Sequence, residues 1–144
     1  MAQPSNLQVA RLEARAAETV RAAIRESLPC DRCLTRSGRP RDAQTLALNE
    51  AGWENAAPGV GWGGDEPWSW FRVWFHVPPD WAGERARLIL PFGGQGMAYL
   101  DGVPWQGRDE HHPDTTLPAS VYDGQPHLLA LECYAVGGTT QIRR

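Results

Sequence analysis

The sequence contains no lysine, since all fourteen of its Lys and Arg residues are arginine, and it has only three cysteines. No apolar run approaches the roughly 20 residues that a membrane-spanning helix needs. The first residues also lack the basic start and apolar stretch of a secretion signal. Few cysteines fit a reducing compartment. We therefore expect a cytoplasmic protein with no membrane partner.

The length and composition of the chain indicate one globular domain. The 144 residues are 42% hydrophobic and 22% charged, which allows a compact core. Residues 1–42 carry eight arginines against five acidic residues, whereas residues 43–144 carry six arginines against twelve acidic residues. Because phosphate binding needs clustered cations, the acidic main body argues against nucleic acid as a partner.

The N-terminal part is predicted to be helical. Within residues 1–28, apolar side chains such as Leu12 and Ile24 recur at spacings near 3.6 residues, and Pro29 follows. The apolar stripe is thin and rich in alanine, so this amphipathic helix should pack against something larger. Residues 29–42 contain Pro, Gly and several arginines, and they are interpreted as an Arg-rich linker.

Residues 43–144 show the pattern of a β-sandwich domain. The clearest strand runs from Trp70 to Val77, where the side chains alternate between two faces. Turn signals at Asp101-Gly102 and Asp123-Gly124 separate further short segments. Additional strands are expected over residues 86–90, 97–100, 103–106, 115–117 and 127–135. The pattern predicts a mainly β fold, an antiparallel β-sandwich or galactose-binding-like jelly roll, with an N-terminal amphipathic helix.

Two clusters contain residue types that bind metals. Cys30 and Cys33 are spaced like half of a zinc site, but a closed site needs four ligands, so we expect two free thiols. The run from Asp109 to Asp114 includes Glu110, His111 and His112. Its carboxylates are expected to bond backbone N–H groups of their own loop. We therefore predict no metal and no other cofactor in this chain.

Six of the seven tryptophans lie between residues 53 and 81. In the predicted strand, Trp70, Arg72, Trp74 and His76 share one face, here called the Trp face. One interpretation is an aromatic platform that stacks on sugar rings. The other, which we favour, is that the N-terminal helix or a partner domain covers this face, because large exposed apolar patches usually mark interfaces.

Several blocks of the sequence resemble one enzyme family. They are Trp70-Phe71-Arg72-Val73, Val77-Pro78-Pro79-Asp80-Trp81-Ala82-Gly83 and the run YLDGVPWQGRDEHH at residues 99–112. Their order and spacing across residues 60–136 are similar to the N-terminal β-sandwich region of glycoside hydrolase family 38 α-mannosidases, in the bacterial and vacuolar branch. One departure is Gln95-Gly96, where the family usually has Glu-Gly.

The resemblance implies a module that precedes a much larger catalytic domain. In that family the catalytic domain holds zinc through His and Asp residues and cleaves mannosides with an Asp nucleophile. No part of that domain is visible in this sequence, and zinc is expected only there. By position, Asp109 and His112 match a D-x-x-H pattern of the family, and they are expected to shape their loop. No catalytic residue is carried over, so we expect the chain alone to be inactive.

The residues leave three hypotheses open. The first is a non-catalytic α-mannosidase domain whose Trp face and N-terminal helix dock on the missing catalytic domain. The second is a free-standing carbohydrate-binding β-sandwich module. The third is a homodimer built on the Trp face. The candidate carbohydrate-binding or domain-docking residues are Trp70, Arg72, Trp74, Trp105, Asp109 and His112.

Overall fold

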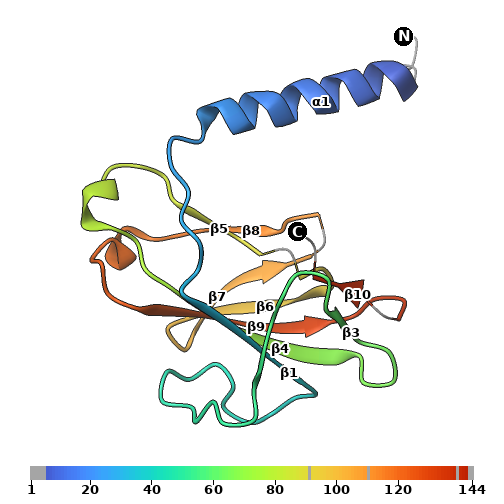
Figure 1. Cartoon of the computed structure of the whole chain (residues 1–144), viewed down its shortest axis with the longest axis vertical. Helices are drawn as coiled ribbons and strands as arrows, with labels where there is room; N and C mark the ends of the chain where they lie inside the picture. The colour runs from blue at the N-terminus through green and yellow to red at the C-terminus, as the bar shows by residue number, and fades with distance from the viewer. Residues whose placement is uncertain (1–5, 91, 110, 139, 143–144) are drawn as a thin grey trace.

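The computed structural model describes residues 6–90, 92–109, 111–138 and 140–142, and it shows one helix and a set of antiparallel strands (Figure 1). Helix α1 spans Asn6–Ala23. The strands are β1 (Arg32–Ser37), β2 (Glu54–Asn55), β3 (Gly61–Trp62), β4 (Trp68–Phe75), β5 (Arg87–Ile89), β6 (Gln95–Leu100), β7 (Val103–Arg108), β8 (Asp114–Thr116), β9 (His127–Tyr134) and β10 (Thr140–Gln141). Short 3-10 turns, η1 (Pro79–Trp81) and η2 (Ala119–Val121), lie between strands.

The main sheet has the strand order β2-β1-β4-β9-β6-β7. Its centre is the antiparallel pair of β4 and β9, which runs from Trp68 opposite Tyr134 to Phe75 opposite His127. Alternation places Phe71 on the inner face of β4, where it is fully buried. The strand predicted from Trp70 to Val77 is therefore confirmed, shifted by two residues.

A second layer packs on the inner face of the main sheet. Strands β5 and β8 pair with each other and form a separate small sheet, and β3 pairs with β10. Leu88 of β5 and Leu117 after β8 belong to the same buried cluster as Phe71 and Leu129 of the main sheet. Each such buried side chain contributes about 1.5–3 kcal/mol relative to exposure. The core of the predicted sandwich thus lies between these layers.

The outer face of the main sheet, which carries the Trp face, is covered by residues 38–53, here called the cover segment. Ala43 is fully buried and belongs to a second cluster with Trp70 and Leu128. Trp53 packs against the same cluster. Figure 1 shows this segment on the side of the main sheet opposite to β5 and β8. The chain's own loop covers this face, so the favoured prediction of a cover by the N-terminal helix or a partner domain is corrected.

The N-terminal residues differ from the prediction in two ways. Helix α1 ends at Ala23 instead of Leu28. Within the predicted linker, residues 32–37 form β1, since backbone pairing with β4 overrides their weak local pattern. The described side chains of α1 are exposed, and Figure 1 shows the helix standing apart from the sheets. No helix in the described part of the chain is long and apolar enough to cross a bilayer.

The predicted hairpin at Asp101-Gly102 joins β6 to β7. Both residues have positive φ, 48° and 86°, as a two-residue hairpin turn requires. The strands predicted around it are present as β5 to β9, each within three residues of its expected bounds.

Candidate functional site

The structure divides the six predicted site residues into two groups. The first group lies on β4 beneath the cover segment and consists of Trp70, Arg72 and Trp74. The second group lies on β7 and in the loop after it, and it consists of Trp105, Asp109 and His112. The two groups belong to separate parts of the fold, so they do not form one site.

Arg72 fastens the cover segment to the sheet. Its side chain is fully buried, and Nη1 donates hydrogen bonds to the backbone carbonyls of Ala43 at 2.6 Å and Thr45 at 2.8 Å. Nε donates to Glu50 Oε1 at 3.0 Å, and Nη2 lies within ion-pair distance of the same oxygen. A buried guanidinium is tolerated only with a paired charge. Glu50 supplies that charge, so the role of Arg72 is structural.

The rest of the Trp face is also occupied. Trp70 is only 4% exposed, and the half-buried Trp74 donates from Nε1 to Glu50 Oε1 at 2.7 Å. The exposed His76 pairs with Asp31. The aromatic platform predicted as one interpretation of this face is therefore wrong for Trp70 and Arg72, which no sugar ring can reach. A homodimer built on the Trp face would have to displace the cover segment.

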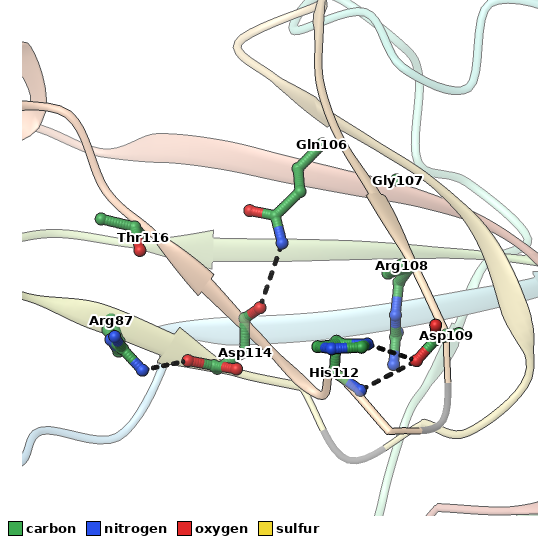
Figure 2. A pocket seen from close by; sticks show the side chains of 8 residues that line it. All are labelled: Arg87, Gln106, Gly107, Arg108, Asp109, His112, Asp114 and Thr116. Carbon is green, nitrogen blue, oxygen red and sulfur yellow. Dashed lines mark hydrogen bonds and ion pairs between the residues drawn. The ribbon is translucent and has the colours of Figure 1, made fainter.

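The second group borders an open pocket of about 480 Å³ between β7 and the β5–β8 pair (Figure 2). Its lining is entirely polar apart from glycine and comes from four segments of the chain. The lining residues are Arg87, Gln106, Gly107, Arg108, Asp109, His112, Asp114 and Thr116.

One side of the pocket is held by contacts between the three strands. Arg87 Nη1 pairs with Asp114 Oδ2 at 2.8 Å, which links β5 to β8. Gln106 Nε2 donates to the backbone carbonyl of Asp114 at 3.4 Å. The buried Thr115 donates from Oγ1 to Gln106 Oε1 at 2.6 Å, so the amide of Gln106 is fixed in orientation.

The other side is a tight turn organised by Asp109. Its Oδ1 accepts from the backbone N–H groups of His111 at 2.8 Å and His112 at 3.0 Å, and lies 2.8 Å from His112 Nδ1. The hydrogen bond to the His112 side chain, helped by those backbone bonds, holds the pKa of the Asp109 carboxyl below its usual value. The predicted loop that bonds its own backbone is confirmed for Asp109, while Glu110 lies outside the described residues.

Arg108 forms the inner end of the pocket. It is only 8% exposed, and its Nη2 donates to the backbone carbonyl of Leu90 at 3.1 Å. Nη1 lies 3.9 Å from Cys133 Sγ, and the buried Nε has no hydrogen-bond partner among the residues that the structure describes. A buried donor without a partner is uncommon in native proteins. This end of the pocket therefore has a positively charged group whose hydrogen bonding is incomplete.

Trp105 stands at the edge of the same region. Its side chain is partly exposed, and Nε1 donates to the backbone carbonyl of Thr116 at 3.1 Å. The hydrogen bond fixes the indole across the gap between β7 and β8. One predicted tryptophan thus remains available to a ligand.

Comparison with known families identifies the module. The sequence matches the family described as "Alpha-mannosidase, jelly roll domain" over residues 35–138. The chain belongs to this family. The resemblance noted across residues 60–136 and the predicted jelly-roll fold are both confirmed.

Solved structures with a similar fold include domains of glycosidases. The jelly-roll domain is similar to a β-glucuronidase of Bacteroides uniformis, with a TM-score of 0.62, 16% identity, and coverage of 82% of this chain and 17% of that chain. A glycosyl hydrolase family 2 member from Bacteroides cellulosilyticus gives a TM-score of 0.63 with 14% identity, covering 84% of this chain and 20% of that chain. At such identities the likeness shows the fold alone. The chain spans about a fifth of the length of these structures. A comparison with curated protein sequences finds no match.

The thiols of the jelly-roll domain are free. Cys30 is exposed, Cys33 is half-buried and Cys133 is buried. Burial, together with the neighbouring Cys30, raises the pKa of Cys33 to about 12, so its reactive thiolate form is scarce near neutral pH. Among the described residues, no group of three or more His, Cys, Asp or Glu side chains is placed to hold a metal. The zinc implied by the family therefore has no fitting ligands in the described part of this domain.

Sequence reasoning missed most of the pocket. Gln106 and Arg108 are two residues apart, so in a strand their side chains lie on the same face. This spacing is the sequence signal that could have placed the β7 residues in one site. Arg87 and Thr116 gave no such signal, because they reach the pocket only through the pairing of β5 with β8. The pocket is thus a product of the topology more than of a local motif.

Proposed function

We propose that this jelly-roll domain is a non-catalytic part of an α-mannosidase and works beside a zinc-dependent catalytic domain that residues 1–144 do not contain. The single observation that carries the proposal is the family match over residues 35–138. The fold shared with glycosidase structures supports the assignment to carbohydrate-active proteins.

The chemistry of the pocket supports a role other than catalysis. Glycoside hydrolysis needs two carboxyl groups placed on either side of a scissile bond. The two carboxylates that line the pocket already have partners, since Asp114 pairs with Arg87 and Asp109 organises its own turn. The lowered pKa of Asp109 also keeps it ionised near neutral pH, so it is a poor proton donor.

Helix α1 is the part of the chain that we propose as the contact with the catalytic domain. With the Trp face covered, apolar side chains of this region remain in solvent: Leu12 of α1 is 65% exposed, and Ile24, directly after α1, is 51% exposed. Arginine and glutamate side chains flank this stripe. An amphipathic helix whose described side chains are exposed gains stability when its apolar stripe is buried.

The proposal is tested by measuring turnover. The purified chain is incubated with zinc and an aryl α-mannoside, beside a bacterial family 38 α-mannosidase as positive control. We expect no release of the aryl group above the blank. Clear hydrolysis that survives repurification would contradict a non-catalytic role.

The second candidate function, a free-standing carbohydrate-binding module, draws support from the pocket and from Trp105. It differs from the first proposal in requiring measurable sugar binding by the isolated chain. The two roles are compatible in one protein.

A further inference from the structure

We propose that the pocket between β7 and the β5–β8 pair is a binding site for one neutral hexose ring of a carbohydrate. This proposal rests on the proposed function in one respect, namely that a sugar is chosen from among the neutral ligands that carry several hydroxyl groups. The location, size and polarity of the site come from the structure itself.

The dimensions of the pocket suit a small ligand. Its volume of about 480 Å³ falls within the roughly 300–1,000 Å³ of small-molecule sites. Gly107 lies between Gln106 and Arg108 on β7 and contributes only backbone to the lining.

The charges of the pocket are arranged in pairs. Arg87 pairs with Asp114 on one side, and His112 lies against Asp109 on the other. All four side chains remain partly exposed, from 32% for Asp114 to 72% for His112, so each has hydrogen-bonding capacity left. The carboxylates and the nitrogen donors offer acceptors and donors side by side, as the hydroxyl groups of a sugar require. With histidine counted as neutral, Arg87 and Arg108 balance Asp109 and Asp114, so the described lining has no net formal charge that would favour a charged ligand.

The polar groups are also held in place before a ligand arrives. The Gln106 amide is fixed by the buried Thr115, and Asp109 is fixed by two backbone N–H groups. The nine-tenths-buried guanidinium of Arg108 closes the inner end, where its Nη2 is held by the Leu90 carbonyl and its Nε is itself buried. Preorganised groups lose little entropy on binding, which favours recognition of a weakly bound sugar.

Trp105 adds an apolar surface at the edge. It is 41% exposed, and its hydrogen bond to the Thr116 carbonyl prevents free rotation of the indole. An aromatic ring held in this way can pack against the C–H face of a pyranose. The polar pocket therefore suits the hydroxyl groups of a hexose, and the fixed aromatic ring suits its apolar C–H face.

The test is a titration of the full chain, labelled with ¹⁵N in its tryptophan indoles, with methyl α-mannoside. The Trp105 indole signal, assigned with Trp105→Phe, should shift saturably with a dissociation constant on the order of 1 mM. The signal of Trp62, whose buried Nε1 bonds the Phe92 carbonyl, serves as an internal control and should stay unchanged. A flat Trp105 signal at concentrations well above that constant overturns the proposal and favours a contact surface for another part of an enzyme.

A matched pair of variants tests the location. Arg87→Gln should weaken binding by about fivefold, as expected for loss of one hydrogen-bonding group. Arg39→Gln removes an arginine of similar exposure, paired with Glu132 at the same 2.8 Å distance elsewhere on the domain, and should leave binding unchanged. Equal losses in both variants, or tighter binding of glucuronate than of the neutral sugar, would overturn the proposal. Aryl mannoside turnover would contradict only the proposed non-catalytic function. A flat titration would contradict the sugar site, and with it the second candidate function, and would leave the non-catalytic α-mannosidase role untouched.

Discussion

The imidazole of His127 lies 2.6 Å, through Nδ1, from Oδ2 of Asp101 in the hairpin between β6 and β7. The other ring nitrogen, Nε2, lies 2.9 Å from Asp123 Oδ1. Asp101 uses its second oxygen to accept from the backbone N–H of Leu128 at 2.9 Å. One largely buried histidine thus joins two turns at the same end of the main sheet.

This arrangement predicts a pH dependence of stability. Burial lowers the pKa of His127, but its hydrogen bonds to Asp101 and Asp123 outweigh that effect and raise it. A raised folded-state pKa means that the stabilisation is fully present below the unfolded value of about 6.5 and is lost as the pH rises through the folded-state pKa. Thermal unfolding should therefore show a falling Tm across that range. The size is expected to be about 1 kcal/mol or less, as for other partly exposed ion pairs.

The variant His127→Asn isolates this effect. It keeps a polar side chain but cannot titrate, so the difference in Tm between wild type and variant should shrink as the pH rises. A difference that stays constant between pH values on either side of the transition would show that protonation of His127 contributes nothing to stability.

Arg72→Ala should be among the most destabilising substitutions in the chain. It would leave the carbonyls of Ala43 and Thr45 without their buried donor and would remove the buried partner of Glu50, which keeps only its contacts with Arg32 and Trp74. Breaking a buried ion pair by removing one partner costs about 3–5 kcal/mol. Urea unfolding monitored by Trp fluorescence measures the loss. Arg39→Ala, at an exposed pair with Glu132, provides the control and should cost less than about 1 kcal/mol. Equal effects would mean that Arg72 does not fasten the cover segment.

Gly96→Ala should disrupt the pairing of β6 with β9. A Cβ at this position would collide with the backbone carbonyl of Glu132, which cannot move without breaking the sheet. We expect a loss of about 3 kcal/mol or more, or failure to fold. Gly107→Ala in the neighbouring strand meets no atom within 4 Å and should change the unfolding free energy by less than about 1 kcal/mol. Comparable behaviour of the two variants in urea would contradict the close approach of β6 and β9.

Removing residues 1–24 should leave the sheets intact. The described side chains of α1 are exposed, and the contacts that tie the following segment down are Arg25 with Glu84 and Glu26 with Trp81. The Tm should fall by no more than about 4 °C, the shift that roughly 1 kcal/mol produces in a domain of this size. Removing residues 1–37 also deletes β1, and this control should abolish cooperative unfolding. A large loss from the shorter deletion would show that α1 stabilises the domain.

The central strands could be predicted because local pattern and final environment agree. In β4 and β9 the alternation of side chains matches the two faces of the sheet, and Asp101-Gly102 has the backbone that its hairpin needs. Strand β1 could not be predicted, because its sequence RCLTRS offers only Leu34 as a buried apolar residue. Its conformation comes from pairing with β4. Strands of two residues, such as β2, carry no pattern at all.

The site could be predicted only where residues are adjacent in the chain. Asp109 and His112 belong to one turn, and the sequence indicated both the turn and its self-bonding carboxylate. Arg72 was predicted on a face that another segment had to cover. The covering residues 38–53 are distant from β4 in the sequence, and no periodic pattern connects the two segments. The pairing of Arg72 with Glu50 is a tertiary contact and leaves no trace in local spacing.

The pairing of β4 with β9 also governs how the domain can fold. Backbone hydrogen bonds join residues 68–75 to residues 127–134. The central pair of the sheet can therefore form only after the segment between these strands has closed into a loop. Closing such a loop costs entropy before any contact compensates, and folds of this kind reach the native state in milliseconds to seconds. During synthesis, β4 therefore leaves the ribosome well before its partner and spends that interval unpaired, with Phe71 and its apolar neighbours open to chaperones or to aggregation.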